Sequence, residues 1–241
     1  MSNILLTGAT RGLGLVIARV LLEQGHAVYA VARKISDDLQ QLLDQHPDRL
    51  HFVAVDLQNV NEIKTSVFEQ AIGFDVPIHG LVNNAALAYD DIVTNLNQET
   101  LQAMFCVNVF AAMELTKHSI KQMLLHQVSG SIVHVSSICV HTGYRGLAMY
   151  GASKGAIEAF SKNTAREWGS KGIRSNCVVA GFMETDMSAE LTDDQKERIY
   201  KRTALKQAVS IDSVAEAVCF LLSDRSAMMT GQKMFVDAGT I

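Results

Sequence analysis

Several residue types that would mark a specialised class of protein are scarce in this chain. Proline occurs only at Pro47 and Pro77, so no proline-rich linker separates domains, and no repeat or low-complexity tract is present. The four cysteines lie far apart without a C-x-x-C pair, which argues against a disulfide framework or a zinc site. The eight histidines form no H-x-x-x-H pair, and we predict no metal site.

The charge balance and the hydropathy pattern exclude two further classes. The formal net charge is −4 at pH 7, whereas a nucleic-acid-binding face needs an excess of basic residues. No run of about 18 apolar residues occurs, so we expect no membrane-spanning helix. Hydrophobic residues make up 48% of the 241 residues, which is ample for a large core. We therefore expect a soluble, cytoplasmic protein with a single domain over residues 1–241.

Predicted strands and helices alternate along the chain. The predicted strands are residues 3–7, 27–32, 50–55, 79–83, 131–137, 173–180 and 233–236. The predicted helices are the segment after Gly14 to about Gln24 and residues 37–46, 60–72, 99–127, 150–169, 193–202 and 212–222. This alternation indicates an α/β fold: a doubly wound parallel sheet of about seven strands with helices on both faces. Ligands of such sheets bind beyond the carboxyl ends of the strands.

A glycine-rich turn joins the first predicted strand to the first helix. Its sequence is Thr7-Gly-Ala-Thr-Arg-Gly-Leu-Gly14. Glycines permit a tight turn and let backbone N–H groups approach a phosphate at a helix N-terminus. Such a segment is often only a turn, but the strand–turn–helix context favours a dinucleotide site. The spacing differs from the commonest dinucleotide fingerprint.

A tyrosine and a lysine stand one helical turn apart at the start of the helix predicted for residues 150–169. Tyr150 and Lys154 lie on the same helix face, so a phenol and an ammonium can meet there. A tyrosine with an unperturbed pKa of about 10 is a poor acid–base catalyst at neutral pH, and a nearby ammonium favours the phenolate. Ser137, at the end of a strand, can supply a hydroxyl beside the phenol. Most isolated Tyr-x-x-x-Lys pairs are solvated helix surface, so the pair gains weight only from the glycine turn before it.

Five motifs, in this order and spacing, resemble those of the short-chain dehydrogenase/reductase family. They are Thr-Gly-x-x-x-Gly-x-Gly, Asn-Asn-Ala-Ala at residues 83–86, Asn108, Ser137 and Tyr150-x-x-x-Lys154. The resemblance extends from about residue 4 to residue 237. Within the family the chain is most similar to the 3-oxoacyl-[acyl-carrier-protein] reductases, on the segments 184–187, 192–196 and 230–237.

The resemblance implies a role for each matched residue. Ser137 bonds the substrate carbonyl, Tyr150 donates a proton to the nascent alkoxide, and Lys154 lowers the tyrosine pKa and holds the nicotinamide ribose. Asn108 helps to keep a water chain behind the lysine. Cofactor contacts are implied for Thr7, Gly8, Thr10, Arg11, Gly12, Leu13, Gly14, Arg33, Asp56 (at adenine), Leu57, Asn83, Ala85, Tyr150, Lys154, Gly181, Met183 and Thr185 (at the carboxamide).

The end of the second predicted strand indicates which nicotinamide cofactor binds. NAD sites usually place an acid there for the ribose hydroxyls, whereas this chain has Ala32. Arg33 follows directly and Arg11 lies in the glycine turn, and two guanidinium groups suit a 2′-phosphate. We therefore predict NADPH/NADP⁺, although Arg33 and Lys34 could also form an ordinary basic loop.

Some positions depart from the family pattern. Ala86 replaces the usual glycine, and Ala180-Gly181 stands where Pro-Gly is usual, which frees a φ angle near the nicotinamide site. Val128 occupies a position where the carrier-protein reductases often have an arginine for their acidic partner, whereas Lys171 keeps the second basic position. The basic residues of the segment 193–202 are mostly expected to be a solvated face, but they could dock a phosphate or an acidic partner. The residues expected to line the substrate mouth are Leu87, Ala88, Tyr89, Val140, His141, Tyr144, Met183 and Met187.

Three functions remain open from the sequence. The leading one is NADPH-dependent reduction of a 3-oxoacyl thioester, bound to acyl carrier protein, in fatty-acid or polyketide-like biosynthesis. The second is a short-chain dehydrogenase acting on a free alcohol or ketone. The third is a non-catalytic NADP-binding regulator, which the intact Asn108, Ser137, Tyr150 and Lys154 disfavour. The resemblance also implies a homotetramer or homodimer, with the helices near 99–127 and 150–169 packed across a two-fold axis.

Overall fold

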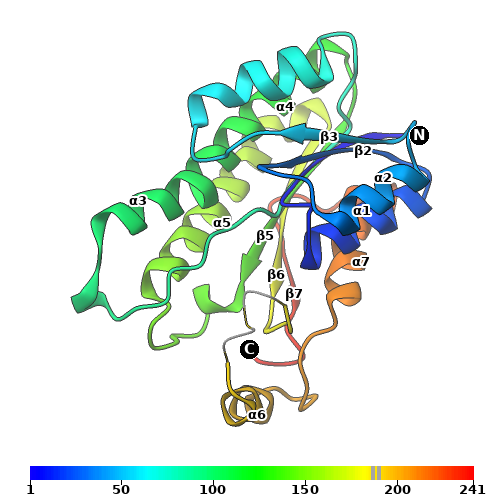
Figure 1. Ribbon diagram of the computed structural model, residues 1–241. Helices are drawn as coiled ribbons and strands as arrows, with labels where there is room; N and C mark the ends of the chain where they lie inside the picture. The colour runs from blue at the N-terminus through cyan, green and yellow to red at the C-terminus, as the bar shows by residue number, and fades with distance from the viewer. Residues whose placement is uncertain (186–187, 189–190) are drawn as a thin grey trace.

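A seven-stranded, fully parallel sheet forms the centre of the protein. The computed structural model describes residues 1–185, 188 and 191–241 (Figure 1). The strand order is β3-β2-β1-β4-β5-β6-β7. The strands are β1 (Asn3–Thr7), β2 (Ala27–Ala32), β3 (Leu50–Ala54), β4 (Gly80–Asn83), β5 (Gly130–Ser137), β6 (Ile173–Ala180) and β7 (Lys233–Val236). The predicted doubly wound sheet is therefore confirmed, with strand bounds that differ from the predicted ones by at most one residue.

Helices cover both faces of the sheet (Figure 1). On one face α1 (Gly12–Glu23), α2 (Asp37–Gln45) and α7 (Ile211–Leu222) bury a core that includes Ile17 and Val218. On the other face lie α3 (Gln98–Phe105), α4 (Ala112–Leu125), α5 (Ala148–Trp168) and a π-helical segment, η2 (Lys64–Ile72). Helix α6 (Asp193–Arg202) stands beyond the sheet and has no buried residue. No helix in the described part of the chain is long and apolar enough to cross a membrane.

The strand order reverses at β1, and this reversal fixes the place of the site. β1 pairs with β2 on one side and with β4 on the other, so the connections leave β1 in opposite directions. Loops diverge at such a switch point and leave a crevice at the carboxyl ends of the strands. The glycine turn after β1 and the Asn-Asn-Ala-Ala segment after β4 meet at this crevice.

The segment predicted as one long helix at residues 99–127 contains a change of helix type. α3 passes into a π-helical segment, η4 (Cys106–Ala111), before α4 begins. Asn108 lies in η4, where its Oδ1 accepts a hydrogen bond from Leu87 N at 2.8 Å and its Nδ2 donates to Leu87 O at 3.0 Å. π-Helical turns inside helices are frequent at functional sites. The predicted long helical stretch with Asn108 in its middle is therefore confirmed, and its change of helix type falls at the residue that carries the implied role.

Candidate active site

The glycine turn after β1 has a shape that only glycine allows. Gly8 and Gly12 have φ values of +70° and +53°. A Cβ on Gly14 would lie 2.0 Å from the Gly8 carbonyl oxygen, so the first turn of α1 packs directly on the end of β1. The N–H groups of that first turn have no partner within the helix and face the crevice. This cradle fits the diphosphate of a dinucleotide.

Two side chains that the sequence did not single out hold the glycine turn in place. The Asn84 Nδ2 group donates to Thr7 O at 2.9 Å and to Gly8 O at 3.2 Å. The Ser36 hydroxyl, at the start of α2, donates to Thr10 O at 2.6 Å. The Asn-Asn-Ala-Ala motif could have pointed to Asn84 as a residue of the site. Ser36 can be recognised in the sequence only as a candidate helix cap.

Thr7 supports the turn and does not offer its hydroxyl to a ligand. The side chain is 1% exposed, and its oxygen accepts from Asn84 N and Ala85 N, each at 3.0 Å. The same hydroxyl donates to Val82 O at 3.3 Å. The bonds of the Thr7 hydroxyl join the loops after β1 and β4 to each other, and a cofactor contact of Thr7 stays a prediction.

Asn83 ends β4 with one polar atom still to be satisfied. Its Nδ2 donates to Thr116 Oγ1 at 3.2 Å and lies 3.1 Å from His134 Nδ1. Burial lowers the pKa of His134 to about 3, so this imidazole is neutral. Within the described residues the buried Asn83 Oδ1 has no hydrogen-bond donor. It lies beside a small cavity that Asn108 and Lys154 also line, and a buried acceptor of this kind suits a ligand or an ordered water.

Tyr150 and Lys154 lie on the first turns of α5. The Lys154 Nζ atom donates to Val135 O at 2.9 Å and lies 5.7 Å from the centroid of the Tyr150 ring. Burial lowers the pKa of Lys154 to about 8. Burial also raises the pKa of the Tyr150 phenol. Loss of hydration therefore dominates the pKa of Tyr150 in this geometry, and the lowering of that pKa by Lys154 stays a prediction.

Ser137 lies where β5 passes into the turn η5 (Ile138–Val140). Its Oγ accepts a hydrogen bond from Cys139 N at 3.3 Å. Gly151, next to Tyr150, lets α5 approach this turn, because a Cβ there would lie 3.2 Å from Cys139 O. The end of β5, with Ser137, and the start of α5, with Tyr150, therefore lie close together.

Five further predicted cofactor residues differ in their surroundings. Leu13 and Leu57, each 7% exposed, are buried in the two cores, so only their backbones can contact a ligand. Arg11, at the start of α1, and Arg33, directly after β2, are exposed at the carboxyl end of the sheet. Asp56 follows β3, and its Oδ1 accepts from Gln58 N at 3.0 Å, as a turn residue does.

The segment after β6 covers the glycine turn. Gly181 lies against the end of β7, since a Cβ there would be 2.7 Å from Asp237 Cα. Met183 packs on the core that contains α1 and α7. The Thr185 methyl group lies 3.8 Å from the position of a Cβ on Gly12, so Thr185 faces the cradle. Met187, expected at the substrate mouth, is outside the described residues.

Two tyrosines expected at the substrate mouth have different surroundings. Tyr89 is 8% exposed and packs with Met104 and Met149 beside Tyr150, and its hydroxyl accepts from Asn97 N at 2.6 Å. The guanidinium carbon of Arg202, in α6, lies 5.9 Å from the centroid of the Tyr144 ring. Tyr89 is therefore a packing residue, whereas Tyr144 joins the loop before α5 to α6.

Comparisons with known proteins identify the family of the chain. Residues 8–240 match the family model described as enoyl-(acyl carrier protein) reductase. The chain is 31% identical over 239 residues to 3-oxoacyl-[acyl-carrier-protein] reductase FabG of Chlamydia pneumoniae, covering 98% of this chain and 96% of that protein. It is 34% identical over 237 residues to carbonyl reductase [NADPH] 2 of Sus scrofa, covering 98% and 94%.

The fold is shared with solved dehydrogenases. One described as a putative 2-deoxy-d-gluconate 3-dehydrogenase from Agrobacterium tumefaciens with bound NADP has a TM-score of 0.91 and 25% identity, covering 99% of this chain and 96% of that one. The chain belongs to the short-chain dehydrogenase/reductase family. It is accordingly an NAD(P)-dependent oxidoreductase.

Gly14→Ala should destabilise the fold, because the new methyl group would collide with a backbone carbonyl. Overpacking of this kind costs about 3 kcal/mol, or about 6–12 °C in Tm for a chain of this size. Gly169→Ala is the matched control, since its φ is −56° and no heavy atom lies within 4 Å of the added carbon. Thermal unfolding of both variants measures the difference, and equal Tm values would contradict the packing seen here.

Lys154 should make stability depend on pH in a defined direction. Its pKa is about 8 in the folded protein against 10.5 as the ordinary value. The cost of burying the ammonium is thus fully present below pH 8 and disappears as the pH rises to 10.5, because only the unfolded state binds the proton in that window. Lys154→Met lacks this cost, so its stability advantage over the parent should shrink by about 2 kcal/mol between roughly pH 7 and pH 10.

Urea unfolding at the two pH values measures this change. Lys117→Met is the control, because the Lys117 side chain is 52% exposed and pairs with Glu114 at the surface. The control should show the same difference from the parent at both pH values. A pH-independent difference for Lys154→Met would show that the buried ammonium is not destabilising.

Proposed function

We propose that the protein is an NADPH-dependent reductase of a 3-oxoacyl thioester bound to acyl carrier protein, and that it forms the 3-hydroxyacyl product. The observation that carries this proposal is the meeting of the partly buried Tyr150 ring with the Lys154 ammonium, 5.7 Å from the ring centroid, at the carboxyl end of the sheet. A phenol can donate its proton to the carbonyl oxygen during a reduction, and a nearby ammonium favours the phenolate that this donation leaves.

The chain's own residues would divide the work on the substrate carbonyl. Ser137 would donate a hydrogen bond to the carbonyl oxygen, and Tyr150 would transfer its proton to that oxygen as negative charge develops. Lys154, with a pKa of about 8, would stabilise the phenolate that remains. Asn108 would hold the loop at Leu87 in place. Hydride transfer to the carbonyl carbon is the chemistry that a bound nicotinamide supplies.

The carrier-bound substrate is supported by the similarity to the 3-oxoacyl-[acyl-carrier-protein] reductase of Chlamydia pneumoniae. The basic residues of α6 support docking of an acidic carrier protein less strongly in the structure than in the sequence. Lys196 lies 3.8 Å from Glu184, and Lys201 lies 3.5 Å from Glu197, so part of the positive charge is neutralised locally. A free ketone or alcohol is the second candidate substrate, and the similarity to carbonyl reductase [NADPH] 2 of Sus scrofa supports it.

A substrate comparison tests the proposed function. We expect NADPH oxidation with a 3-oxoacyl thioester on acyl carrier protein to have a kcat/KM at least ~10-fold above that with any free ketone of a matched panel, which corresponds to about 1.4 kcal/mol. Tyr150→Phe should lower kcat by about 10²–10⁴ and leave NADPH binding unchanged. Faster turnover of a free ketone or alcohol would replace the first candidate by the second.

The choice of NADPH is proposed to depend on Arg33. NADPH should exceed NADH by at least ~100-fold in kcat/KM, which two charge-assisted contacts to a 2′-phosphate can supply. Arg33→Ala should raise the KM for NADPH and remove most of the preference. Lys34→Ala, at the exposed neighbouring position, is the matched control and should keep it. A parent enzyme that used both cofactors equally well would contradict this assignment.

We also propose that the protein is a homo-oligomer, a dimer or a tetramer. Phe110, in η4 between α3 and α4, is 49% exposed. An interface along α4 and α5, as expected from the resemblance, would cover it.

A further inference from the structure

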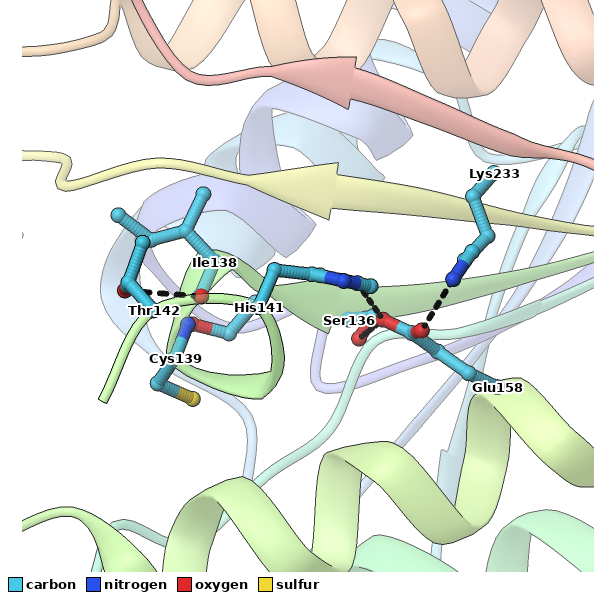
Figure 2. A network of polar contacts seen from close by, with 8 residues as sticks. Ser136, Ile138, Cys139, His141, Thr142, Glu158 and Lys233 are labelled. Carbon is cyan, nitrogen blue, oxygen red and sulfur yellow. Dashed lines mark hydrogen bonds and ion pairs between the residues drawn. The ribbon is translucent and has the colours of Figure 1, made fainter. Parts of the chain in front are cut away.

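A buried glutamate on α5 joins four parts of the protein near the site. The Glu158 side chain is 7% exposed and stands one helical turn beyond Lys154. Its Oε1 accepts a hydrogen bond from the Ser136 hydroxyl at 2.6 Å and lies 3.0 Å from His141 Nε2. Its Oε2 lies 3.3 Å from Lys233 Nζ. Figure 2 shows these side chains converging on the Glu158 carboxylate.

The partners of Glu158 belong to segments that shape the proposed active site. Ser136 directly precedes Ser137 in β5, and His141 ends the turn η5 that follows. Lys233 begins β7, and Phe235 of the same strand packs edge-on against the His141 ring at 5.0 Å. The carboxylate therefore links α5 to the strand end with Ser137, to the segment after it and to β7.

The lysine of the site and this glutamate attach α5 to consecutive residues of β5. Lys154 donates to Val135 O at 2.9 Å, and Glu158 accepts from the hydroxyl of the next residue, Ser136. Tyr150, Lys154 and Glu158 are spaced four residues apart, so they share one face of the helix. Two attachments one turn apart fix both the distance and the rotation of the helix relative to the strand end.

A carboxylate is a costly choice for a position that only needs to be filled. A buried charge loses its hydration, and apolar residues of similar volume often give equal or greater stability. Three polar partners on three different segments offset that loss here, and all three constrain geometry. This pattern favours a role in orientation over a role in stability.

We propose that Glu158 is a positioning residue, whose carboxylate holds the end of β5 and the segment 138–147 against α5 so that Ser137 and Tyr150 keep their relative position. The proposal rests on the proposed function only in assigning those two side chains to the reaction. The link itself is a property of the structure and can be measured without any substrate.

Kinetics of matched variants form the first test. Glu158→Ala should lower kcat by about 10–100-fold with the KM for NADPH within about threefold of the parent, as expected for a small misplacement of reacting groups. Glu158→Gln retains an oxygen that can accept from Ser136 and His141, so it should keep at least about a third of the parent kcat. A kcat for Glu158→Ala within twofold of the parent would overturn the proposal.

Glu114→Ala is the control for this series. Glu114 also pairs with a lysine and a histidine, at 2.7 Å from Lys117 Nζ and 2.8 Å from His118 Nε2, but all three residues lie within α4. The control removes the same kind of carboxylate and the same kinds of partner without touching β5. Its kcat should equal that of the parent.

Thiol labelling gives a second test that does not depend on the reaction. Cys139 lies in η5, within the segment that Glu158 is proposed to hold, and burial raises the pKa of its thiol. Cys219, in α7 and 4% exposed, reports opening of the whole domain. In Glu158→Ala, peptide mapping should show Cys139 labelled by a maleimide at least about tenfold faster than in the parent, with Cys219 unchanged.

The labelling outcomes separate this proposal from the proposed function. Selective acceleration at Cys139 supports the link even if no 3-oxoacyl thioester is reduced. Equal acceleration of both thiols, or none of either, would overturn it. If Glu158→Ala does not fold, His141→Ala keeps the carboxylate paired with Ser136 and Lys233 and should accelerate Cys139 labelling in the same selective way.

Discussion

The attachment of α5 to the carboxyl end of β5 is the constraint on which the rest of the site depends. The pairing of β4 with β5 ends at Asn83 and His134, while β6 continues to pair with β5 as far as Ser137. The last three residues of β5 therefore extend past β4, and α5 supplies polar contacts to the first two of them. Lys154 donates a hydrogen bond to the Val135 carbonyl, and Glu158 accepts one from the Ser136 hydroxyl. The end of β5, which has no β4 neighbour, is thus contacted by α5, the helix that carries Tyr150.

The attachment of α5 to β5 removes water from the side chains of the site, and this loss of hydration explains their protonation states. Burial removes hydration from both Lys154 and Tyr150. It lowers the pKa of Lys154 and raises that of Tyr150, so each shift favours the neutral form of the side chain. The site therefore holds a protonated phenol next to an ammonium that gives up its proton more readily than an exposed lysine. Functional sites commonly keep such unfavourable groups because the surrounding core supplies the stability. Here the cores on the two sheet faces are that support.

The sequence predicted the strands, the order of the motifs and their meeting at one edge, because these follow from local periodicity and from the geometry of parallel sheets. It could not predict the π-helical turn at Asn108, since a change in backbone hydrogen bonding leaves the apolar pattern of residues 99–127 intact. The sequence also failed to identify Asn84 and Glu158. Their partners Gly8 and Ser136 lie 76 and 22 residues away in the sequence, and only the fold brings them together.

The substrate could not be predicted from the sequence, and the surroundings of α6 give a physical reason. Helix α6, which stands beyond the sheet, has no buried residue and is held by surface contacts: the Tyr200 hydroxyl bonds Glu184, and Arg202 lies over Tyr144. Backbone bonds from Ala204 N to Gly239 O at 3.0 Å and from Leu205 N to Ala238 O at 3.1 Å tie its end to the C-terminal residues. Nothing in a core dictates these side chains, so they can vary without unfolding the protein. The proposed reaction residues are therefore constrained by the packing of α5 against β5, whereas the side chains of α6 are not constrained by a core.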